Sequence, residues 1–303
     1  MTSDNTRIAD PSPQTFAGDS LGQTARRLFG AMRPKFFPAS VLPVIAGSTW
    51  GLQAAGNFDW LVFVLALFAT VCVHGAANVL NDVGDDAGGT DERNEDRIYP
   101  YTGGSRFIQQ GIMSASEMAR WGISLLAVAA IAGLVLIYLK GTMVLYFGLA
   151  GVALCVLYSL GPVRLASIGI GETAVAIGFG VVPVAGAAWL QGAALDTNLL
   201  LFSLPVSFWV AAILLINEVP DISADGATGK RTLPVRLGLG GTSVLYLLLH
   251  LGAAGATIAV TLAGAMPLLS PAVPVLLLVI ALKSAVAIRK GIDDRPGMTK
   301  AIE

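Results

Sequence analysis

The sequence predicts an all-α membrane protein, a polytopic bundle of transmembrane helices, and three observations support this fold class. Hydrophobic residues make up 54% of the 303 residues and charged residues only 13%, whereas soluble domains carry about 25% charged residues. The mean hydropathy is +0.71. The apolar residues form long runs without the period-2 alternation of membrane-spanning strands. These features exclude a soluble globular domain, a disordered chain and a disulfide-stapled secreted fold.

Eight apolar stretches reach the length of about 20 residues that a helix needs to cross a bilayer. They cover residues 36–55, 59–81, 118–139, 142–161, 168–190, 199–218, 240–263 and 268–288. The sequence predicts three regions: a flexible polar tail at residues 1–25, one transmembrane domain at residues 26–290, and a polar C-terminal segment at residues 291–303. No apolar region of the signal-peptide type precedes the first stretch, so we expect no cleaved signal peptide.

Basic residues predict the orientation of the bundle. Of the 19 lysines and arginines, all except Lys140 lie in or beside the terminal segments and the connections after the second, fourth and sixth stretches. Cytoplasmic loops of membrane proteins are enriched in Lys and Arg. We therefore expect a multi-pass protein of the cell (inner) membrane, with both termini and these three connections in the cytoplasm. Among the loops, the opposite side holds only two acidic residues, Asp59 and Asp196.

Two acidic segments lie on the predicted cytoplasmic side. The first follows the second stretch and holds seven carboxylates between Asp82 and Asp96. On a helix, Asn78, Asn81 and Asp85 would share one face. The second segment follows the sixth stretch and contains Glu218, Asp221 and Asp225.

Four-residue steps also relate Asn217, Asp221 and Asp225, which predicts a second polar stripe. Pro220 is expected to distort that helix locally. If the second and sixth helices are neighbours, the two stripes face one cavity.

Close-set carboxylates repel one another unless a cation lies between them, and Asp and Asn oxygens suit a hard cation such as Mg²⁺. Basic residues follow both acidic segments, namely Arg97 and Arg106 after the first and Lys230 and Arg231 after the second. Arginine binds phosphate oxygens in a bidentate manner, and the glycines in residues 103–105 could present backbone N–H groups to an anion. The pattern predicts a diphosphate held through Mg²⁺. Solvated surface loops are the alternative, and two such segments on one side make that alternative weaker.

At these residues the sequence resembles the UbiA superfamily of intramembrane prenyltransferases, along most of residues 26–290. Asn81, Asp82 and Asp85 are similar to the family's N-D-x-x-D motif, and Asp221 and Asp225 to its D-x-x-x-D motif. The chain looks most similar to the branch that prenylates 1,4-dihydroxy-2-naphthoate. That similarity lies in the position of Asp91, in RPKFFPASVLPVIAG at 33–47 and in the GIGE that ends at Glu172. The segments NEVPD and YTGGSR depart from the usual pattern of the branch and leave the acceptor open.

The resemblance implies Mg²⁺-dependent transfer of a polyprenyl group from polyprenyl diphosphate to an aromatic acceptor within the lipid bilayer. With 1,4-dihydroxy-2-naphthoate the product would be demethylmenaquinol, formed with loss of CO₂. Two Mg²⁺ ions are implied, one held by Asn81, Asp82 and Asp85 and the other by Asp221 and Asp225, with Asp91 as a weaker ligand. Substrate contacts are expected from Asn78, Asn217, Arg97, Arg106, Lys230 and Arg231. The family usually has nine helices, so the last is expected to be absent here.

Two further polar residues lie inside the apolar stretches. Glu172 lies near the cytoplasmic end of the fifth stretch, and a carboxylate within a span is expected to be functional. It could orient the acceptor or take its proton; a hydrogen-bonded structural glutamate is the alternative. His74 is expected to be a hydrogen-bonded core residue.

Three alternative functions stay open. A related transferase could use 4-hydroxybenzoate or a non-quinone lipid as its acceptor. A membrane transporter is the alternative from another class, although transporters place polar groups near the middle of the membrane and the charges here cluster at one surface. A non-catalytic scaffold would not need paired acidic stripes. No feature of the sequence predicts nucleic-acid binding.

Overall fold

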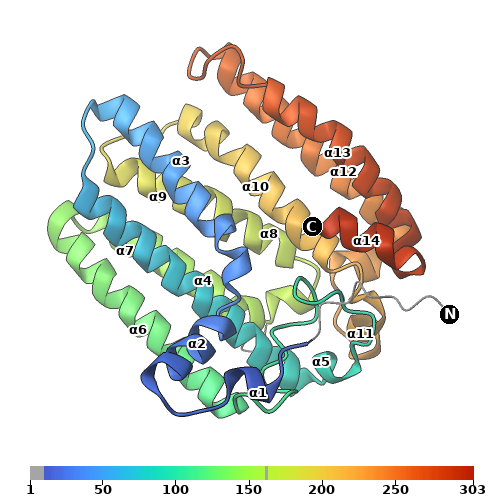
Figure 1. Ribbon diagram of the computed structural model, residues 1–303. Helices are drawn as coiled ribbons and strands as arrows, with labels where there is room; N and C mark the ends of the chain where they lie inside the picture. Colours follow the sequence, from blue (N-terminus) through green and yellow to red (C-terminus); the bar gives the residue numbers. More distant parts are fainter. Residues whose placement is uncertain (1–9, 161–162) are drawn as a thin grey trace.

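The computed structural model describes residues 10–160 and 163–303, and all regular structure within these residues is helical (Figure 1). The helices are α1 (Pro13–Phe16), α2 (Leu21–Ala31), α3 (Pro38–Ala55), α4 (Trp60–Gly88), α5 (Thr90–Arg93), α6 (Ala115–Lys140), α7 (Met143–Ser159), α8 (Gly171–Val175), α9 (Val182–Leu190), α10 (Thr197–Asn217), α11 (Ile222–Ala227), α12 (Leu233–Leu262), α13 (Ala272–Lys290) and α14 (Arg295–Ile302). A π-helical turn, Ala176–Val181, joins α8 to α9. The predicted all-α bundle is confirmed.

Each predicted apolar stretch overlaps one of the long helical segments, and several of these segments extend beyond it. Within the described residues, six segments are long and apolar enough to cross a membrane: Trp60–Gly88, Ala115–Lys140, Gly171–Leu190, Thr197–Asn217, Leu233–Leu262 and Ala272–Ile302. Helix α7 is apolar but shorter, and the 18-residue α3 is not among the six. The chain is a multi-pass membrane protein, and the number of eight spans stays a prediction.

Two acidic residues predicted for the non-cytoplasmic side begin helices. Asp59 accepts a hydrogen bond from the Val62 N–H at 3.1 Å and starts α4. Asp196 accepts one from the Leu199 N–H at 2.8 Å and starts α10. Such caps satisfy N–H groups that have no partner within the helix. The lone basic residue predicted there, Lys140, pairs with Asp59 at 3.0 Å.

Helix packing relies on small residues where backbones approach closely. Helix α4 packs against α6 and α7, α3 against α9, and α10 against α12, which also packs on α13. A Cβ at Gly47 of α3 would lie 2.2 Å from the Val184 carbonyl oxygen of α9. One at Gly180 would lie 2.1 Å from Ser207 Oγ of α10. Membrane helices commonly pack through such positions.

The short elements gather at one end of the bundle, from α1 at the bottom of Figure 1 through α5 and α11 to α14 at the right. The predicted N-terminal tail contains α1 and the start of α2; its residues 1–9 lie outside the described part of the chain. In the predicted polar C-terminal segment, Met298 of α14 is fully buried in a cluster that includes Ile98 and Ile288. The described residues near both termini therefore help to build the end of the bundle that carries the acidic segments.

Candidate active site

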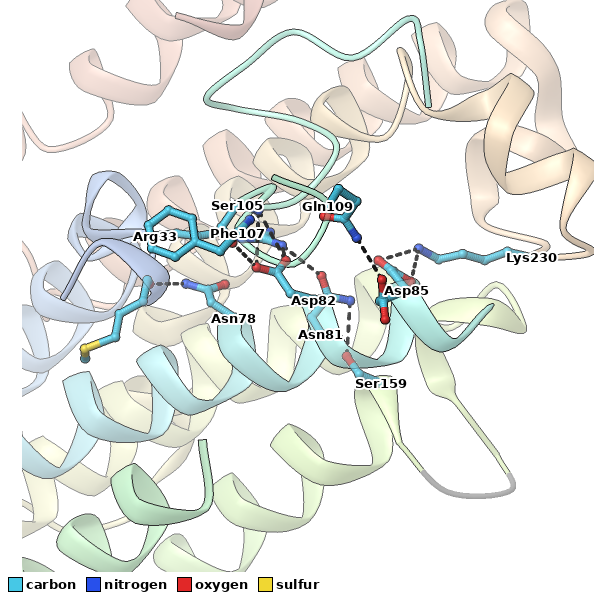
Figure 2. Close-up of polar contacts among 12 residues, drawn as sticks. Arg33, Asn78, Asn81, Asp82, Asp85, Ser105, Phe107, Gln109, Ser159 and Lys230 are labelled. Atoms are coloured by element: carbon cyan, nitrogen blue, oxygen red, sulfur yellow. Dashed lines mark hydrogen bonds and ion pairs between the residues drawn. The ribbon is translucent and has the colours of Figure 1, made fainter. Parts of the chain in front are cut away.

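The first acidic motif lies on a helix. Helix α4 continues to Gly88, so Asn78, Asn81, Asp82 and Asp85 project from consecutive turns of one helix (Figure 2). Asn78 Nδ2 donates to the Met32 carbonyl at 2.9 Å. Asn81 Nδ2 donates to Ser159 Oγ at 3.2 Å. These bonds fix α4 against the segments before α3 and at the end of α7.

Asp82 is directed into the protein. Its side chain is 2% exposed and forms an ion pair with Arg33. The backbone N–H of Ser105 donates to Asp82 Oδ2 at 3.2 Å, and the Ser105 hydroxyl donates to the same oxygen. Asp82 thus joins α4 to Arg33 and to the loop between α5 and α6.

The second polar stripe is interrupted by a turn between two helices. Helix α10 ends at Asn217, a turn covers residues 218–221, and α11 carries Asp225. The distortion predicted at Pro220 is confirmed. Asp221 accepts a hydrogen bond from Asn94 Nδ2 at 2.7 Å, and Asp225 is 1% exposed.

Lys230 connects the two acidic segments. Its Nζ lies 3.2 Å from Asp85 Oδ1 and 3.5 Å from Asp225 Oδ1. Burial lowers the pKa of Lys230, but the charges of Asp85 and Asp225 outweigh that effect and hold its pKa well above the usual value. Lys230 is therefore a fixed positive charge at the meeting point of both motifs.

One cavity of about 210 Å³ connects these residues. Its polar end is lined by Arg33, Asn78, Asn81, Asp85, Asp91, Asn94, Asn217, Glu218, Asp221, Asp225 and Lys230. Its remaining wall is mainly apolar and includes Val73, Leu154, Phe179, Val210 and Leu214. Residues of both polar stripes line this one cavity, as expected from the sequence.

Five predicted site residues lie outside this lining. Asp82 is buried behind it, as described above. Arg97 pairs with Asp10 and donates to the Asn94 carbonyl at 2.6 Å, while the buried Arg106 donates to the Asp91 carbonyl. Arg231 is exposed, and Glu172 is 4% exposed behind the wall, where Oε1 accepts the Leu233 N–H at 3.3 Å.

The acidic end contains buried oxygens that lack partners. Among the described residues, Asp91 Oδ2 and Asp225 Oδ1 accept no hydrogen bond, although Asp225 Oδ1 lies near Lys230. Burial, with the nearby charge of Asp85 as a further cause, raises the pKa of Asp91 to about 7, against the effect of Arg33. Burial likewise raises the pKa of Asp225 to about 7, against the effect of Lys230. The site lacks positive charge for the carboxylates it holds.

The donor set fits a hard cation shared with a bound anion. No group of three or more carboxylate, His or Cys side chains within the described residues is arranged to hold a metal by itself. Mg²⁺, however, is commonly held by one or two carboxylates together with substrate phosphates. The unpartnered oxygens of Asp91 and Asp225 are suitable ligands for such an ion.

Arg33, Asn94 and Thr102 line the cavity but were not among the predicted site residues. Arg33 lies 48 residues from Asn81 in sequence, and its Nη2 donates to Asn81 Oδ1 at 3.5 Å. Such distant pairs leave no periodic signal in one sequence. The glycine loop was anticipated: Gly103 and Gly104 line the cavity at φ values of 72° and 77°. A Cβ at Gly104 would lie 2.9 Å from Asp91 Oδ2.

Comparison with known sequences gives consistent matches over most of the chain. The model of the UbiA prenyltransferase family matches residues 40–300. A 1,4-dihydroxy-2-naphthoate octaprenyltransferase of Haemophilus influenzae is 32% identical over 221 residues, which cover 68% of this chain and 67% of that protein. A protein of the same name from Mycobacterium tuberculosis is 32% identical over 217 residues, or 71% of this chain and 70% of that protein.

Solved structures of two UbiA homologs have the same fold. A UbiA homolog from Archaeoglobus fulgidus, bound to GPP and Mg²⁺, aligns with a TM-score of 0.67 at 16% identity, covering 91% of this chain and 94% of that one. A UbiA homolog from Aeropyrum pernix aligns with a TM-score of 0.62 at 18% identity, covering 92% and 95% of the two chains. At these identities the structural likeness concerns the fold.

Proposed function

The chain belongs to the UbiA prenyltransferase family and is a prenyltransferase, and we propose that it transfers a polyprenyl group from polyprenyl diphosphate to an aromatic ring. One observation carries the proposal. Asp85, Asp221, Asp225 and Lys230 converge at the polar end of a cavity whose remaining wall is mainly apolar. This division matches a donor with a charged diphosphate and a hydrocarbon tail. The transporter alternative is set aside because the relatives are prenyltransferases.

The donor is proposed to lie along the length of the cavity. Its diphosphate would meet Lys230 and Arg33 at the polar end, where both side chains line the wall. The isoprenoid chain would contact Leu154, Phe179 and Val210. Of the other predicted contacts, Arg97 and Arg106 support the loop over this end, and Arg231 is an exposed charge nearby.

Two magnesium ions are proposed, on the residues that the two motifs supply. Asn81, Asp85 and Asp91 would hold one ion, and Asp221 and Asp225 the other. Asp82 is the less direct candidate, because its oxygens already bind Arg33 and Ser105. When bound, Mg²⁺ would neutralise charge on the departing diphosphate.

The reaction breaks the allylic C–O bond, and its electron pair leaves with the diphosphate. Lys230 and Arg33 stabilise that growing negative charge, which is the main way such sites lower a barrier. The apolar wall keeps water from the allylic cation. The ring then forms the new C–C bond, and loss of a proton or of CO₂ restores its aromaticity.

The proposed acceptor is 1,4-dihydroxy-2-naphthoate, which would yield demethylmenaquinol with loss of CO₂. Support comes from the names of relatives at 32% identity. 4-Hydroxybenzoate and a non-quinone lipid remain the alternative acceptors. We also propose that the end of the bundle with the acidic segments and both termini faces the cytoplasm, because all basic residues except Lys140 lie in or beside the segments assigned to that side.

An acceptor panel tests the proposal. Purified protein in detergent would receive Mg²⁺, a polyprenyl diphosphate and either 1,4-dihydroxy-2-naphthoate or 4-hydroxybenzoate. A prenylated, decarboxylated quinol is the expected product, and chelation of Mg²⁺ should abolish it. If product forms only with 4-hydroxybenzoate, that compound replaces 1,4-dihydroxy-2-naphthoate as the assigned acceptor. If product forms equally well in chelator, the proposed requirement for Mg²⁺ is wrong.

A further inference from the structure

Glu218 lies at the boundary between the two parts of the cavity. It directly follows the last residue of α10, and its N–H donates to the Leu214 carbonyl at 3.0 Å. Val210, Leu214 and Glu218 follow one another at four-residue steps, and all three line the cavity. The first two belong to the apolar wall, whereas the next lining residue along the chain is Asp221 at the polar end. Glu218 is thus the carboxyl group that borders the apolar part of α10.

The side chain of Glu218 is buried and incompletely bonded. The residue is 7% exposed, and Oε2 has no hydrogen-bond partner among the described residues. Buried polar groups in proteins nearly always have a partner, and an unsatisfied one costs free energy. Glu218 lines the cavity, and its buried Oε2 lacks a protein partner, so this side chain is suited to accept a hydrogen bond from a ligand.

A second carboxyl group, that of Glu172, lies close to Glu218. Burial and the nearby carboxyl of Glu172 raise the pKa of Glu218 well above its usual value, and Glu172 itself lies outside the cavity lining. Glu172 accepts the Leu233 N–H at the start of α12. Glu172 is thus held by α12 close to Glu218, so it is a positioning residue and Glu218 is the group that lines the cavity.

The donor substrate does not provide the missing partner. A diphosphate is an anion and would be repelled by a carboxyl pair that carries charge. An isoprenoid tail has no hydrogen-bond donor. A ring hydroxyl has the required donor, and the border of the apolar wall is where a ring must lie to meet the allylic carbon.

We propose that Glu218 accepts a hydrogen bond from a ring hydroxyl of the acceptor and thereby sets both its position and its class. The inference rests on the proposed function. It restricts the acceptor to hydroxylated rings and directs any acceptor carboxylate away from Glu218, toward Lys230 and Arg33. Glu218 thus has a role separate from the other carboxylates of its segment, since Asp221 bonds to Asn94 and Asp225 pairs with Lys230.

Steady-state kinetics of three variants test the role. Glu218→Gln keeps the shape but weakens the acceptor oxygen, Glu218→Leu removes it, and Glu95→Gln is the matched change at an exposed glutamate. The KM for 1,4-dihydroxy-2-naphthoate should rise about tenfold in Glu218→Leu and less in Glu218→Gln. The KM for the polyprenyl diphosphate should not change.

Analogue binding separates a direct contact from a structural one. The dimethyl ether of the acceptor has no hydroxyl donor, and its inhibition constant is measured in competition with the diol. Wild-type protein should prefer the diol, and Glu218→Leu should lose this preference, as a double-mutant cycle requires for a direct contact. The Tm of Glu218→Leu should be unchanged or higher, because an apolar residue replaces a buried unsatisfied carboxyl.

The possible failures are distinguishable. If wild-type protein prenylates no hydroxylated ring, the proposed function and this inference are both wrong. If it prenylates 1,4-dihydroxy-2-naphthoate while the acceptor KM of Glu218→Leu stays within about twofold of that of Glu95→Gln, only the inference is wrong. An unchanged preference for the diol over the dimethyl ether in Glu218→Leu would lead to the same conclusion.

Discussion

Lys230 Nζ lies 3.2 Å from Asp85 Oδ1, so the loop after α11 and the last turns of α4 meet in one ion pair. These residues are 145 positions apart in the chain. Asp225 lies 3.5 Å from the same Nζ. A single lysine therefore holds a carboxylate from each acidic motif, at the end of the cavity proposed to receive the diphosphate.

Asp85→Asn should lower prenyl transfer by about 100-fold or more, because it removes a proposed ion ligand that acts on the leaving group. Asp86→Asn is the matched control, since Asp86 is on the same helix and accepts from Gln109 Nε2 at 3.1 Å. The rates of both variants are measured as a function of Mg²⁺ concentration. Equal rates in the two variants would contradict the assignment of Asp85.

Asp82→Asn should act mainly on stability. Breaking a buried ion pair by removing one partner costs about 3 kcal/mol or more, and Asp82 also accepts the Ser105 N–H. Asp85→Asn should cost less, because Asp85 is 21% exposed and Lys230 keeps Asp225 as a partner. Thermal unfolding in detergent compares the two. A lower Tm for Asp85→Asn than for Asp82→Asn would reverse the assigned roles.

The metal-free protein should become less stable as the pH rises from 5 to 8. The pKa of Asp225 in the folded protein is about 7, whereas an unfolded aspartate titrates near 3.9. The folded state therefore binds more protons between these values, so raising the pH through that window favours unfolding. Tm is measured against pH in chelator. Asp225→Asn should make the profile less steep, with the remaining slope expected from Asp91, whose pKa is also raised to about 7. An equally steep profile in that variant would exclude Asp225 as a source.

Arg295→Gln should loosen the loop over the polar end of the cavity. Arg295 donates to the Asp96 carbonyl at 3.1 Å and also to the Arg97 carbonyl. Limited proteolysis should cut residues 94–106 faster in this variant, and the KM for polyprenyl diphosphate should rise. Lys300→Gln changes an exposed charge on the same helix and should leave both unchanged. Cleavage at the wild-type rate in Arg295→Gln would show that α14 does not hold the loop.

Local rules were sufficient to predict much of this molecule. The length and hydropathy of the apolar runs predicted the helical bundle, and three- and four-residue spacing predicted the stripe of Asn78, Asn81 and Asp85, because both depend on helix geometry alone. The break at Pro220 followed from the missing N–H of proline. These predictions required no knowledge of which helices are neighbours.

Contacts between distant segments could not be predicted in this way. Arg33 reaches Asp82 from the segment before α3, and Asn94 reaches Asp221 from the loop after α5. Glu218 looked like one more member of an acidic cluster until the fold placed Glu172 behind it. Asp82 and Asp85 are both motif residues, yet one is buried and the other lines the cavity. The burial and the partners of a side chain depend on the whole fold, so they cannot be predicted from the spacing of residues in one sequence.

The hydrogen bonds from Arg295 to the Asp96 and Arg97 carbonyls determine when, during synthesis of the chain, the active site can be completed. The loop that covers the diphosphate end is synthesised early, but its last supports lie 199 and 198 residues later in the chain. At about 5–20 residues per second, a ribosome needs roughly 10–40 s to cover that distance. The site is therefore completed only once α14 has been made, after the helices that shield a reactive cation from water.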